Sequence, residues 1–260
     1  MNNMNVLITS GGTTERIDTV RSISNMSTGT LGSLIADRFS EENSIEKIFY
    51  ICGKSAMKPN TERAIIKKIE SVSNLESAIR ETLELADIDI IVHAMAVSDY
   101  RVRSVTSMAG IAGLVVSNLD SLVNMDSRSA RSAVAELLKN HESAISAEGK
   151  ISSDIDDILL LMERTPKIIA LFQELSPRST LVGFKLLDNV PLDALIDTGY
   201  KLLMHNKCSF VLANDLRDIS EKQHIGYLID KDKNYTRHSN KEEIAAAIVA
   251  AAIGERTKMS

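Results

Sequence analysis

The chain has 260 residues, of which 44% are apolar and 25% are charged, and its formal net charge is −5 at pH 7. A chain of this length and apolar content can bury a full hydrophobic core, and its composition excludes disordered, collagen-like and repeat proteins. Nucleic-acid backbones are held by clustered Lys and Arg. No basic run occurs, so we expect no nucleic-acid partner.

The sequence carries no signal for export or membrane insertion. Residues 1–5 include no basic residue, and the apolar run 6–8 is too short for the core of a signal peptide. The most apolar helical stretch, 244–253, has about half of the ~20 residues that span a bilayer. The two cysteines, Cys52 and Cys208, lie far apart, so neither a disulfide framework nor a zinc pair is predicted. We expect a cytoplasmic protein without a membrane partner.

Strand and helix patterns alternate along the chain. Short apolar runs predict strands, and apolar residues at helical spacing predict the helices between them. The expected strands are 5–9, 47–52, 64–69, 88–93, 180–184 and 210–213, with a brief apolar run at 158–162, and the expected helices are 31–39, 73–85, 167–174, 192–204 and 244–253. This alternation predicts a Rossmann-like α/β fold, with a mainly parallel sheet and helices on both of its faces.

Two helices begin with recognisable capping patterns. Ser73 and Glu76 form a possible capping box at the start of the second expected helix. Thr165 followed by Pro166 has the pattern of an N-cap with proline at the first helical position. We expect both pairs to mark helix starts.

The polar, serine-containing stretch 101–150 interrupts the alternation. It holds one predicted short helix near 130–139. Structureless loops of this length are uncommon unless they are functional. We therefore predict a single α/β domain over 1–260 that carries a flap or insertion at 101–150.

Several polar segments follow the predicted strands. Ligands of a parallel sheet bind beyond the carboxyl ends of its strands, which directs attention to 10–12, 93–99, 184–185 and 214–215. The glycine pair in the first segment would let backbone N–H groups approach an anion. A tight turn explains the pair equally well, because the dinucleotide and P-loop patterns are absent.

Two further segments suggest a nucleotide, and a third, at 150–157, has the pattern of a solvated loop. Hydroxyls and glycines in 24–32 immediately precede a helix, where phosphate binding is favoured over simple capping. Small side chains in 93–100 would leave a slot for a flat ring, and Asp99 could accept its N–H or a ribose hydroxyl; a strand ending in an N-cap is the alternative. Lys150 precedes three carboxylates in 150–157, a run that usually marks a solvated loop.

Together these segments resemble the phosphopantothenate-cysteine ligases, also called phosphopantothenoylcysteine synthetases. The similarity covers about residues 6–215, and it rests on Ile-Thr-Ser-Gly-Gly-Thr at 8–13, Val-Arg-Ser-Ile-Ser-Asn at 20–25, Ala-Val-Ser-Asp-Tyr at 96–100, Thr-Pro at 165–166, Val-Gly-Phe at 182–184 and Ala-Asn-Asp at 213–215. No flavin-dependent decarboxylase precedes Met1, so we expect the free-standing bacterial form.

The resemblance implies a two-step ligation in coenzyme A biosynthesis. The carboxylate of 4'-phosphopantothenate attacks the α-phosphate of CTP, which releases pyrophosphate and leaves an acyl-cytidylate. The amine of L-cysteine then displaces CMP. Mg2+ is implied as the companion of the triphosphate, with its ligands unknown. CTP is chosen on family grounds with ATP as the other possibility, and a homodimer is expected on the same grounds.

The resemblance also implies site residues. Asn25 and Lys150 would be catalytic: Asn25 would hold the acyl-nucleotidylate, and Lys150 would stabilise negative charge on phosphate or on the tetrahedral intermediate. Asn25 and Arg21 would contact the substrate. The implied nucleotide-binding residues are Gly11, Gly12, Ser27, Thr28, Gly29, His93, Ala94, Met95, Ala96, Asp99, Lys150, Thr165, Pro166, Phe184, Lys201 and His205.

This chain departs from the commoner family pattern in the segment 24–32, called the second loop below because it follows the glycine loop at 10–12. Thr30 stands where a lysine is frequent, and Met26 replaces a usual histidine. These changes reduce the positive charge that this loop can offer a phosphate.

Two other functions stay open. One is an NAD(P)-dependent short-chain reductase, which would have the same layout of strands and helices. Its Y-x-x-x-K pattern occurs at Tyr50 and Lys54 and at Tyr227 and Lys231, but neither pair is expected on a helix, and the glycine fingerprint for dinucleotides is missing. The other is a nucleotide-sensing module without turnover. NAD(P)H binding would favour the first, and CTP binding without pyrophosphate release would favour the second.

Overall fold

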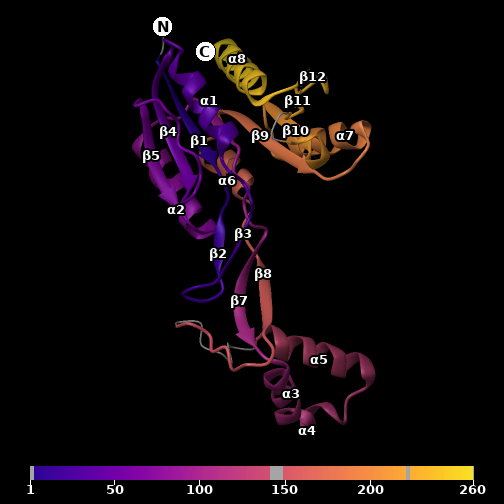
Figure 1. Cartoon of the computed structure of the whole chain (residues 1–260). Helices are drawn as coiled ribbons and strands as arrows, with labels where there is room; N and C mark the ends of the chain where they lie inside the picture. The colour runs from indigo at the N-terminus through magenta and orange to yellow at the C-terminus, as the bar shows by residue number, and fades with distance from the viewer. Residues whose placement is uncertain (1–2, 141–148, 221–222, 260) are drawn as a thin grey trace. The chain divides into compact units, whose positions relative to one another are not determined.

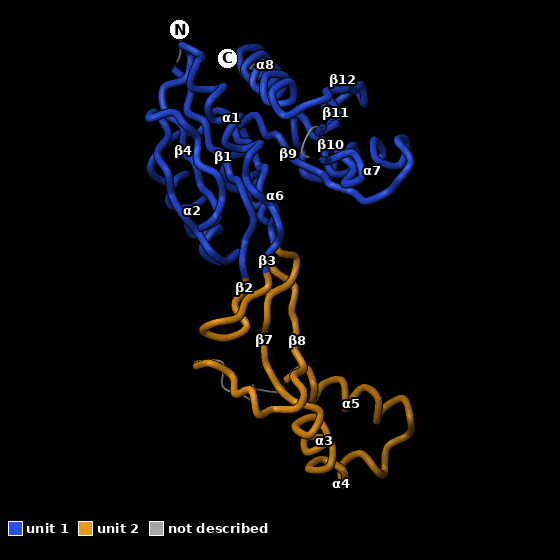
Figure 2. Tube along the Cα trace, viewed as in Figure 1, with its two compact units in different colours: residues 1–14, 24–97, 167–260 blue, residues 15–23, 98–166 orange. Residues whose placement is uncertain are grey.

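The computed structural model describes residues 3–140, 149–220 and 223–259. The chain forms two compact units (Figure 2). Unit 1 consists of residues 1–14, 24–97 and 167–260, and unit 2 consists of 15–23 and 98–166. The range 101–150, predicted as an insertion, falls within unit 2. None of the helices among the described residues is long and apolar enough to cross a bilayer.

Unit 1 is built on a sheet with the strand order β12-β11-β10-β9-β6-β1-β4-β5 (Figure 1). The six neighbouring strands β10, β9, β6, β1, β4 and β5 pair in parallel. Strand β11 pairs antiparallel with β10, and β12 pairs antiparallel with β11. Their bounds are β1 Met4–Ser10, β4 Ile45–Gly53, β5 Ala64–Ile69, β6 Ile90–His93, β9 Thr180–Leu187, β10 Phe210–Asp215, β11 Gly226–Ile229 and β12 Tyr235–His238. This sheet confirms the predicted Rossmann-like α/β fold.

Helices cover both faces of this sheet, as predicted. Alternate residues of a strand point to opposite faces, so in β1 Leu7 packs beneath α2, α6 and α7, while Val6 and Ile8 pack beneath α1 and α8. Burial on both sides explains why the central strands are continuously apolar. The helix bounds are α1 Thr30–Ser40, α2 Val72–Leu85, α6 Ile168–Leu175, α7 Leu192–His205 and α8 Lys241–Met259, with a short 3-10 helix at Leu216–Asp218.

Both predicted caps are wrong. The capping box of α2 is formed by Ser71 and Asn74, two residues before the predicted pair, because Ser71 Oγ accepts from the Asn74 N–H and the Asn74 side chain accepts from the Ser71 N–H. Helix α6 has Lys167 as its N-cap. Thr165 instead donates its hydroxyl to the carbonyl of Ser98 at 2.5 Å, which leaves it no role at the helix start.

Unit 2 contains a long antiparallel pair of strands and three helices. Strand β7 (Tyr100–Thr106) pairs with β8 (Leu159–Arg164), so that the brief apolar run at 158–162 belongs to this pair and not to the main sheet. Between these strands the chain forms α3 (Met108–Ser117), α4 (Leu119–Leu122) and α5 (Ser127–Lys139). Strands β2 (Thr14–Arg16) and β3 (Ser22–Ser24) form a further two-stranded sheet.

Candidate active site

The carboxyl edge of β1 and β6 is where the predicted loops of unit 1 meet. Beyond the last strand residues the pairing continues, because Ala96 N–H donates to Gly11 O at 2.8 Å and Thr13 N–H donates to Ala96 O at 3.1 Å. Gly11 has φ +81, a conformation that glycine adopts without strain. The loop after β1 and the segment after β6 are therefore held side by side.

Asn25 is fixed against the same loop through its backbone. Its N–H donates to Thr13 O at 3.2 Å, and its carbonyl accepts from the Ser27 N–H at 3.0 Å. A Cβ atom on Gly12 would lie 2.2 Å from the Asn25 carbonyl oxygen, so glycine is required for this close approach. The Asn25 side chain is exposed, which leaves its amide free to face a substrate.

The start of α1 completes this edge. Gly29 has φ +73, and its carbonyl accepts the Ser10 hydroxyl at 3.1 Å. A Cβ on Gly32 would lie 2.2 Å from Ser10 Oγ. The N-cap of this helix, Gly29, has no side chain, and its first turn has no acidic residue. Thr28 Oγ1 accepts from the Thr30 N–H at 3.4 Å, and the other N–H groups of the first turn make this segment the positive end of a helix.

The predicted nucleotide segment 93–96 divides between the core and the edge. His93 is buried, shares a 2.7 Å hydrogen bond between its Nδ1 and Thr9 Oγ1, and stacks edge-on against Phe172. Burial lowers the pKa of His93 to about 4, so the imidazole is neutral at pH 7. Met95 is also buried. Ala94 and Ala96 are half-buried and are the members of this segment best placed to line a ligand.

Phe184 lies at the same edge. Val182 pairs with Val92 in parallel register, so Phe184, two residues later in β9, is level with Ala94. Both side chains pack against the apolar core on the α1 and α8 side of the sheet. A flat ring bound above Ala94 would therefore meet the half-buried Phe184 ring.

The Asn214-Asp215 segment supports this edge from β10. Asp215 is 1% exposed and accepts the N–H groups of Asn189 at 2.9 Å and Val190 at 2.8 Å, which fixes the loop after β9. Burial itself raises the pKa of Asp215, but these donors, Arg217 N–H and the Arg217 guanidinium more than offset burial, and the net pKa is lowered. Asp215 is thus a structural anchor.

Lys201 and His205 are not brought to this edge. They lie on the exposed side of α7, which leads from the carboxyl end of β9 to the amino end of β10. After His205, Ser209 N–H already donates to Leu181 O near the start of β9. The last turns of α7 are therefore at the amino edge of the sheet, and nucleotide binding by Lys201 and His205 stays a prediction.

In unit 2, the structure brings the Arg21 and Lys150 segments together. Asp18 accepts from the N–H groups of Val20 at 2.8 Å, Arg21 at 2.7 Å and Ile151 at 3.2 Å. The Arg21 guanidinium donates to Ile151 O at 3.0 Å. Burial raises the pKa of Asp18, but the backbone donors and Arg21 more than offset it, and the net pKa is lowered. Lys150 itself is exposed.

Asp18 was not predicted as a site residue. Its only signal was a carboxylate three residues before Arg21, and its partner Ile151 lies far along the chain. Asp18 joins the segments that precede and follow the long insertion of unit 2.

Asp99, Thr165 and Pro166 lie together at one end of the β7 and β8 pair, where β7 begins and β8 ends. Thr165 N–H donates to Asp99 O at 3.0 Å, next to the Thr165 hydroxyl contact with Ser98. Asp99 and Pro166 are exposed. Unit 2 therefore holds two groups of predicted residues, one at Arg21 and Lys150 and one at Asp99 and Thr165.

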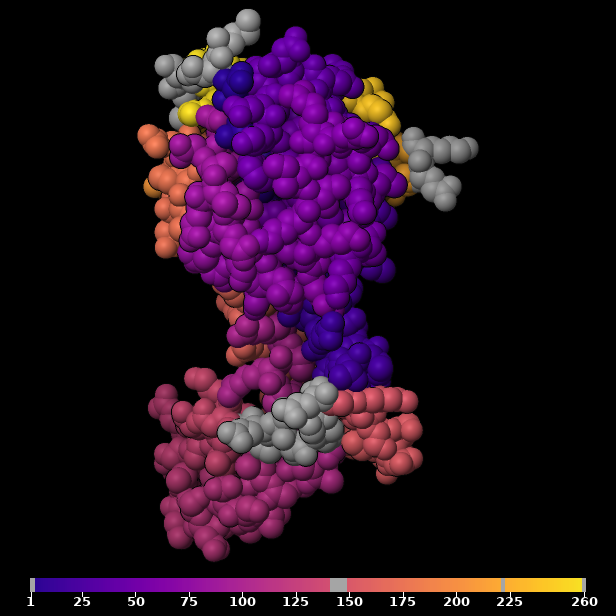
Figure 3. All heavy atoms as spheres, turned by 90° about the vertical axis from the view of Figure 1, so that its left-hand side faces the viewer, coloured from indigo at the N-terminus to yellow at the C-terminus, as the bar shows by residue number. Residues whose placement is uncertain are grey.

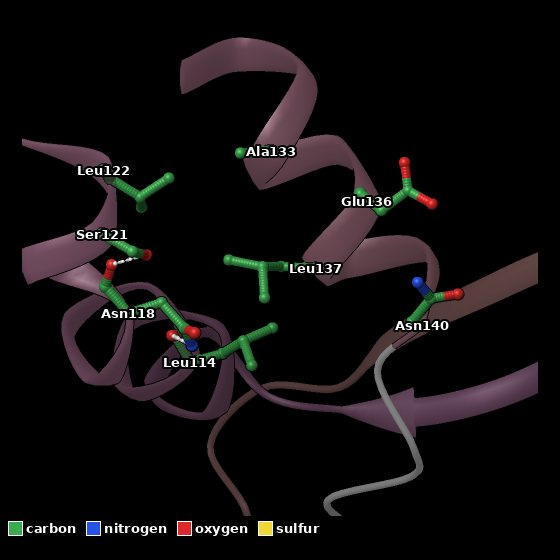
Figure 4. A pocket seen from close by; sticks show the side chains of 8 residues that line it. All are labelled: Leu114, Asn118, Ser121, Leu122, Ala133, Glu136, Leu137 and Asn140. Atoms are coloured by element: carbon green, nitrogen blue, oxygen red, sulfur yellow. Dashed lines mark hydrogen bonds between the residues drawn. The ribbon is translucent and has the colours of Figure 1, made fainter. Parts of the chain in front are cut away.

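Helices α3, α4 and α5 of unit 2 surround a separate pocket of about 400 Å³ (Figure 4). None of the predicted site residues lines it. The lining residues are Leu114, Asn118, Ser121, Leu122, Ala133, Glu136, Leu137 and Asn140.

The reductase alternative finds no support. Tyr50 lies inside β4 and donates its hydroxyl to Met57 O at 2.9 Å, and burial raises its pKa. Lys54 is paired with Glu70 at 2.6 Å. A tyrosine with a raised pKa and an occupied hydroxyl is not poised for proton transfer.

Comparison with known proteins places the chain in one family. Residues 1–109 and 117–254 match the DNA/pantothenate metabolism flavoprotein C-terminal domain, and the chain belongs to that family. This confirms the family resemblance seen in the motifs.

Individual relatives agree. The bifunctional coenzyme A biosynthesis protein CoaBC of Methanocaldococcus jannaschii is 28% identical over 251 residues, which cover 94% of this chain and 49% of that protein. Its counterpart from Thermococcus kodakarensis is 28% identical over 227 residues, covering 87% and 45%. The chain thus spans about half the length of these relatives.

Among solved structures, the DNA/pantothenate metabolism flavoprotein from Streptococcus pneumoniae is similar with a TM-score of 0.78 and 32% identity, over 97% of this chain and 99% of that chain. The C-terminal domain of a CoaBC protein has the same fold, with a TM-score of 0.65 and 19% identity over 100% and 97% of the two chains.

Proposed function

We propose that the chain ligates 4'-phosphopantothenate to L-cysteine in coenzyme A biosynthesis, with CTP as the activating nucleotide. The observation that carries this proposal is the junction of Gly12, Asn25 and Ala96, in which three family motifs meet at one sheet edge through backbone contacts. A relative of the same fold, Cab2 H337A, has been solved in complex with phosphopantothenate-cysteine, which is the product of this reaction.

The proposed chemistry needs activation of a carboxylate. In the first step a substrate carboxylate oxygen attacks the α-phosphorus of CTP, and the bond to pyrophosphate breaks. In the second step the cysteine amine attacks the acyl carbon, the bond to CMP breaks, and the amine proton is released. A mixed anhydride makes the second step feasible because CMP is a good leaving group.

Particular side chains are proposed to assist these steps. The exposed Asn25 amide would donate to the acyl or phosphate oxygen, held in place by its fixed backbone. The Lys150 ammonium would stabilise negative charge as it develops. Half-buried Ala94, Ala96 and Phe184 of unit 1 would contact the nucleotide. Nucleotide binding by Asp99 and Thr165 stays a prediction.

Mg2+ is proposed to enter with the triphosphate. Within the described ranges, no group of three or more His, Cys, Asp or Glu side chains is arranged to hold a metal ion. A resident cage does not fit these residues, whereas Mg2+ commonly binds through substrate phosphates and water. We assign no step of the reaction to a protein-held metal.

A homodimer is proposed on family grounds. Unit 2 offers apolar surface that a second copy could cover, since large apolar side chains stand exposed along α3 and α4. Met108 is 58% exposed, Val116 67% and Leu119 48%. Exposed apolar patches of this kind commonly mark contact surfaces.

A direct assay tests the ligase. Purified protein with 4'-phosphopantothenate, L-cysteine, CTP and Mg2+ should release pyrophosphate only when the phosphopantothenate is present. ATP in parallel tests the choice of nucleotide. If the folded protein releases no pyrophosphate with either CTP or ATP, the ligase assignment is overturned. Tight CTP binding without pyrophosphate release would point to a nucleotide sensor instead.

A further inference from the structure

The loop after β4 packs directly on both glycine loops of the candidate site. A Cβ on Gly11 would lie 2.5 Å from the Ala56 Cβ, and one on Gly29 would lie 3.0 Å from the same atom. A Cβ on Gly53 would lie 2.4 Å from Gly12 O. Residues 53–58 therefore form a third loop that packs against the glycine loop at 10–12 and against the segment 24–32, which carries Asn25 and Thr28.

Hydrogen bonds fix the position of this third loop. Met57 N–H donates to Thr28 O at 2.9 Å, and the Tyr50 hydroxyl donates to Met57 O at 2.9 Å. Further on, Asn60 N–H donates to Asp37 Oδ1 in α1 at 2.7 Å. Lys58 lies between these anchors, so its backbone runs beside the first turns of α1.

The second loop has no positive side chain of its own. Residues 22–37 contain no Lys, Arg or His, and the nearby His93 is neutral because burial lowers its pKa to about 4. A phosphate at this loop would meet backbone N–H groups but no compensating cation from the loop itself. Phosphate sites commonly add a lysine or arginine to such N–H groups.

Lys58 is available to supply that charge. It is exposed, and no ion-pair partner for it occurs in the described part of the chain, whereas Lys54 in the same loop is paired with Glu70 at 2.6 Å. Burial raises the pKa of the Cys52 thiol, and the Lys68 and Lys58 charges act in the opposite direction. The Lys68 and Lys58 charges therefore both act at the carboxyl end of β4. Figure 3 views unit 1 from the side of β5, the edge strand beside β4.

Besides Lys54 and Lys68, Lys185 is a further cation at this edge, but it belongs to the opposite face. It follows Phe184 in β9, and consecutive strand side chains point to opposite faces. Because Phe184 packs on the α1 and α8 side, Lys185 points to the α7 side, away from the start of α1.

We propose that Lys58 binds a substrate phosphate held at the Ser27–Gly29 loop, supplying the positive charge that this loop lacks. The proposal rests on the ligase function and adds a binding residue to it. Two substrates bring the required chemistry, the terminal phosphate of 4'-phosphopantothenate and the triphosphate of CTP. A lysine has a flexible stem and a compact charge, so it serves either as a point charge.

The experiment compares Lys58→Gln and Lys58→Arg with wild type, and Lys54→Gln serves as the matched control. The dissociation constants of 4'-phosphopantothenate, pantothenate and CTP are measured by calorimetry, and thermal melting curves establish that each variant is folded. Lys58→Gln should weaken binding of one phosphorylated ligand by roughly 10- to 100-fold, the usual effect of losing a charged hydrogen bond. Lys58→Arg should restore most of it, and Lys54→Gln should change little.

The outcomes separate the possible sources of phosphate. Weakening for phosphopantothenate but not for pantothenate or CTP assigns the substrate phosphate, and weakening for CTP alone assigns the triphosphate. Unchanged binding of both, or equal weakening for pantothenate and phosphopantothenate, would overturn the proposal. If Lys58→Gln weakens phosphopantothenate binding but the wild type forms no product, the Lys58 contact is supported and the ligase assignment is overturned.

Discussion

Gly12 and Asn25 meet so closely that no side chain fits between them. A Cβ on Gly12 would lie 2.2 Å from the Asn25 carbonyl oxygen, well inside van der Waals contact. The Thr13 and Asn25 backbones are hydrogen-bonded at 3.2 Å beside this point. The first glycine loop therefore places the proposed catalytic asparagine by steric fit.

Gly12→Ala should displace Asn25. Either the loop or Asn25 must move, so we expect kcat to fall by at least about tenfold and stability to fall by about 1–3 kcal/mol, as in overpacked sites. Gly113→Ala is the control, because nothing lies within 4 Å of its added Cβ in α3. Steady-state kinetics and urea unfolding measure both effects. Wild-type kinetics in Gly12→Ala would show that this contact does not position Asn25.

Asn25→Asp should abolish most turnover without unfolding the chain. The exposed carboxylate would repel phosphate where the amide is proposed to donate, and losing such a donor costs on the order of 10²–10³ in rate. Asn43→Asp, exposed in the turn before β4, makes the same charge change away from the site. Amide formation followed by chromatography reports the effect, and equal rates for the two variants would remove Asn25 from the mechanism.

The layout of unit 1 was predictable, whereas much of unit 2 was not. Strands such as β1 and β6 are buried on both faces and appear as continuous apolar runs. Helix α3 has no buried residue and is apolar on nearly all sides, so its sequence shows no separate apolar stripe. Its glycines and β-branched residues also have low helix propensity. Strand β7 pairs with β8 across a long insertion, a contact that local pattern does not encode.

The candidate site was predictable only in part, for a similar reason. Motifs located Gly11, Gly12 and Asn25, whose separation in sequence is short. They did not show that Met95 is core or that Asp18 ties Arg21 to Ile151, because burial and long-range hydrogen bonds depend on the folded chain. Ala56 and Lys58 entered only through packing on the glycine loops.

Asp18→Asn should weaken unit 2 in a pH-dependent way. The folded state lowers the pKa of Asp18, so the unfolded chain takes up a proton first as pH falls, and the stabilisation is full above the ordinary aspartate pKa of about 3.9 and lost below it. The stability difference between wild type and Asp18→Asn should therefore shrink from pH 6 to pH 3. Exposed Asp120→Asn is the control in urea unfolding. A difference independent of pH would contradict the carboxylate role.

His93 should make the protein less stable in mild acid. Its pKa is lowered from 6.5 to about 4 by burial, so between these values the unfolded state binds more protons and stability falls with falling pH, by up to about 3 kcal/mol at the acid end. His93→Gln should flatten this dependence at the cost of lower stability at pH 7. Exposed His205→Gln should retain the wild-type slope, and a steep slope in His93→Gln would assign the effect to another group.

Transfer of a carboxylate oxygen to the nucleotide distinguishes an acyl-cytidylate from other routes to the amide. Phosphopantothenate labelled with oxygen-18 in its carboxylate is converted with CTP and cysteine, and the nucleotide product is examined by mass spectrometry. An acyl-cytidylate must pass one carboxylate oxygen to CMP, so we expect labelled CMP and unlabelled pyrophosphate. Product formation with unlabelled CMP would contradict activation at the α-phosphate and with it the proposed mechanism.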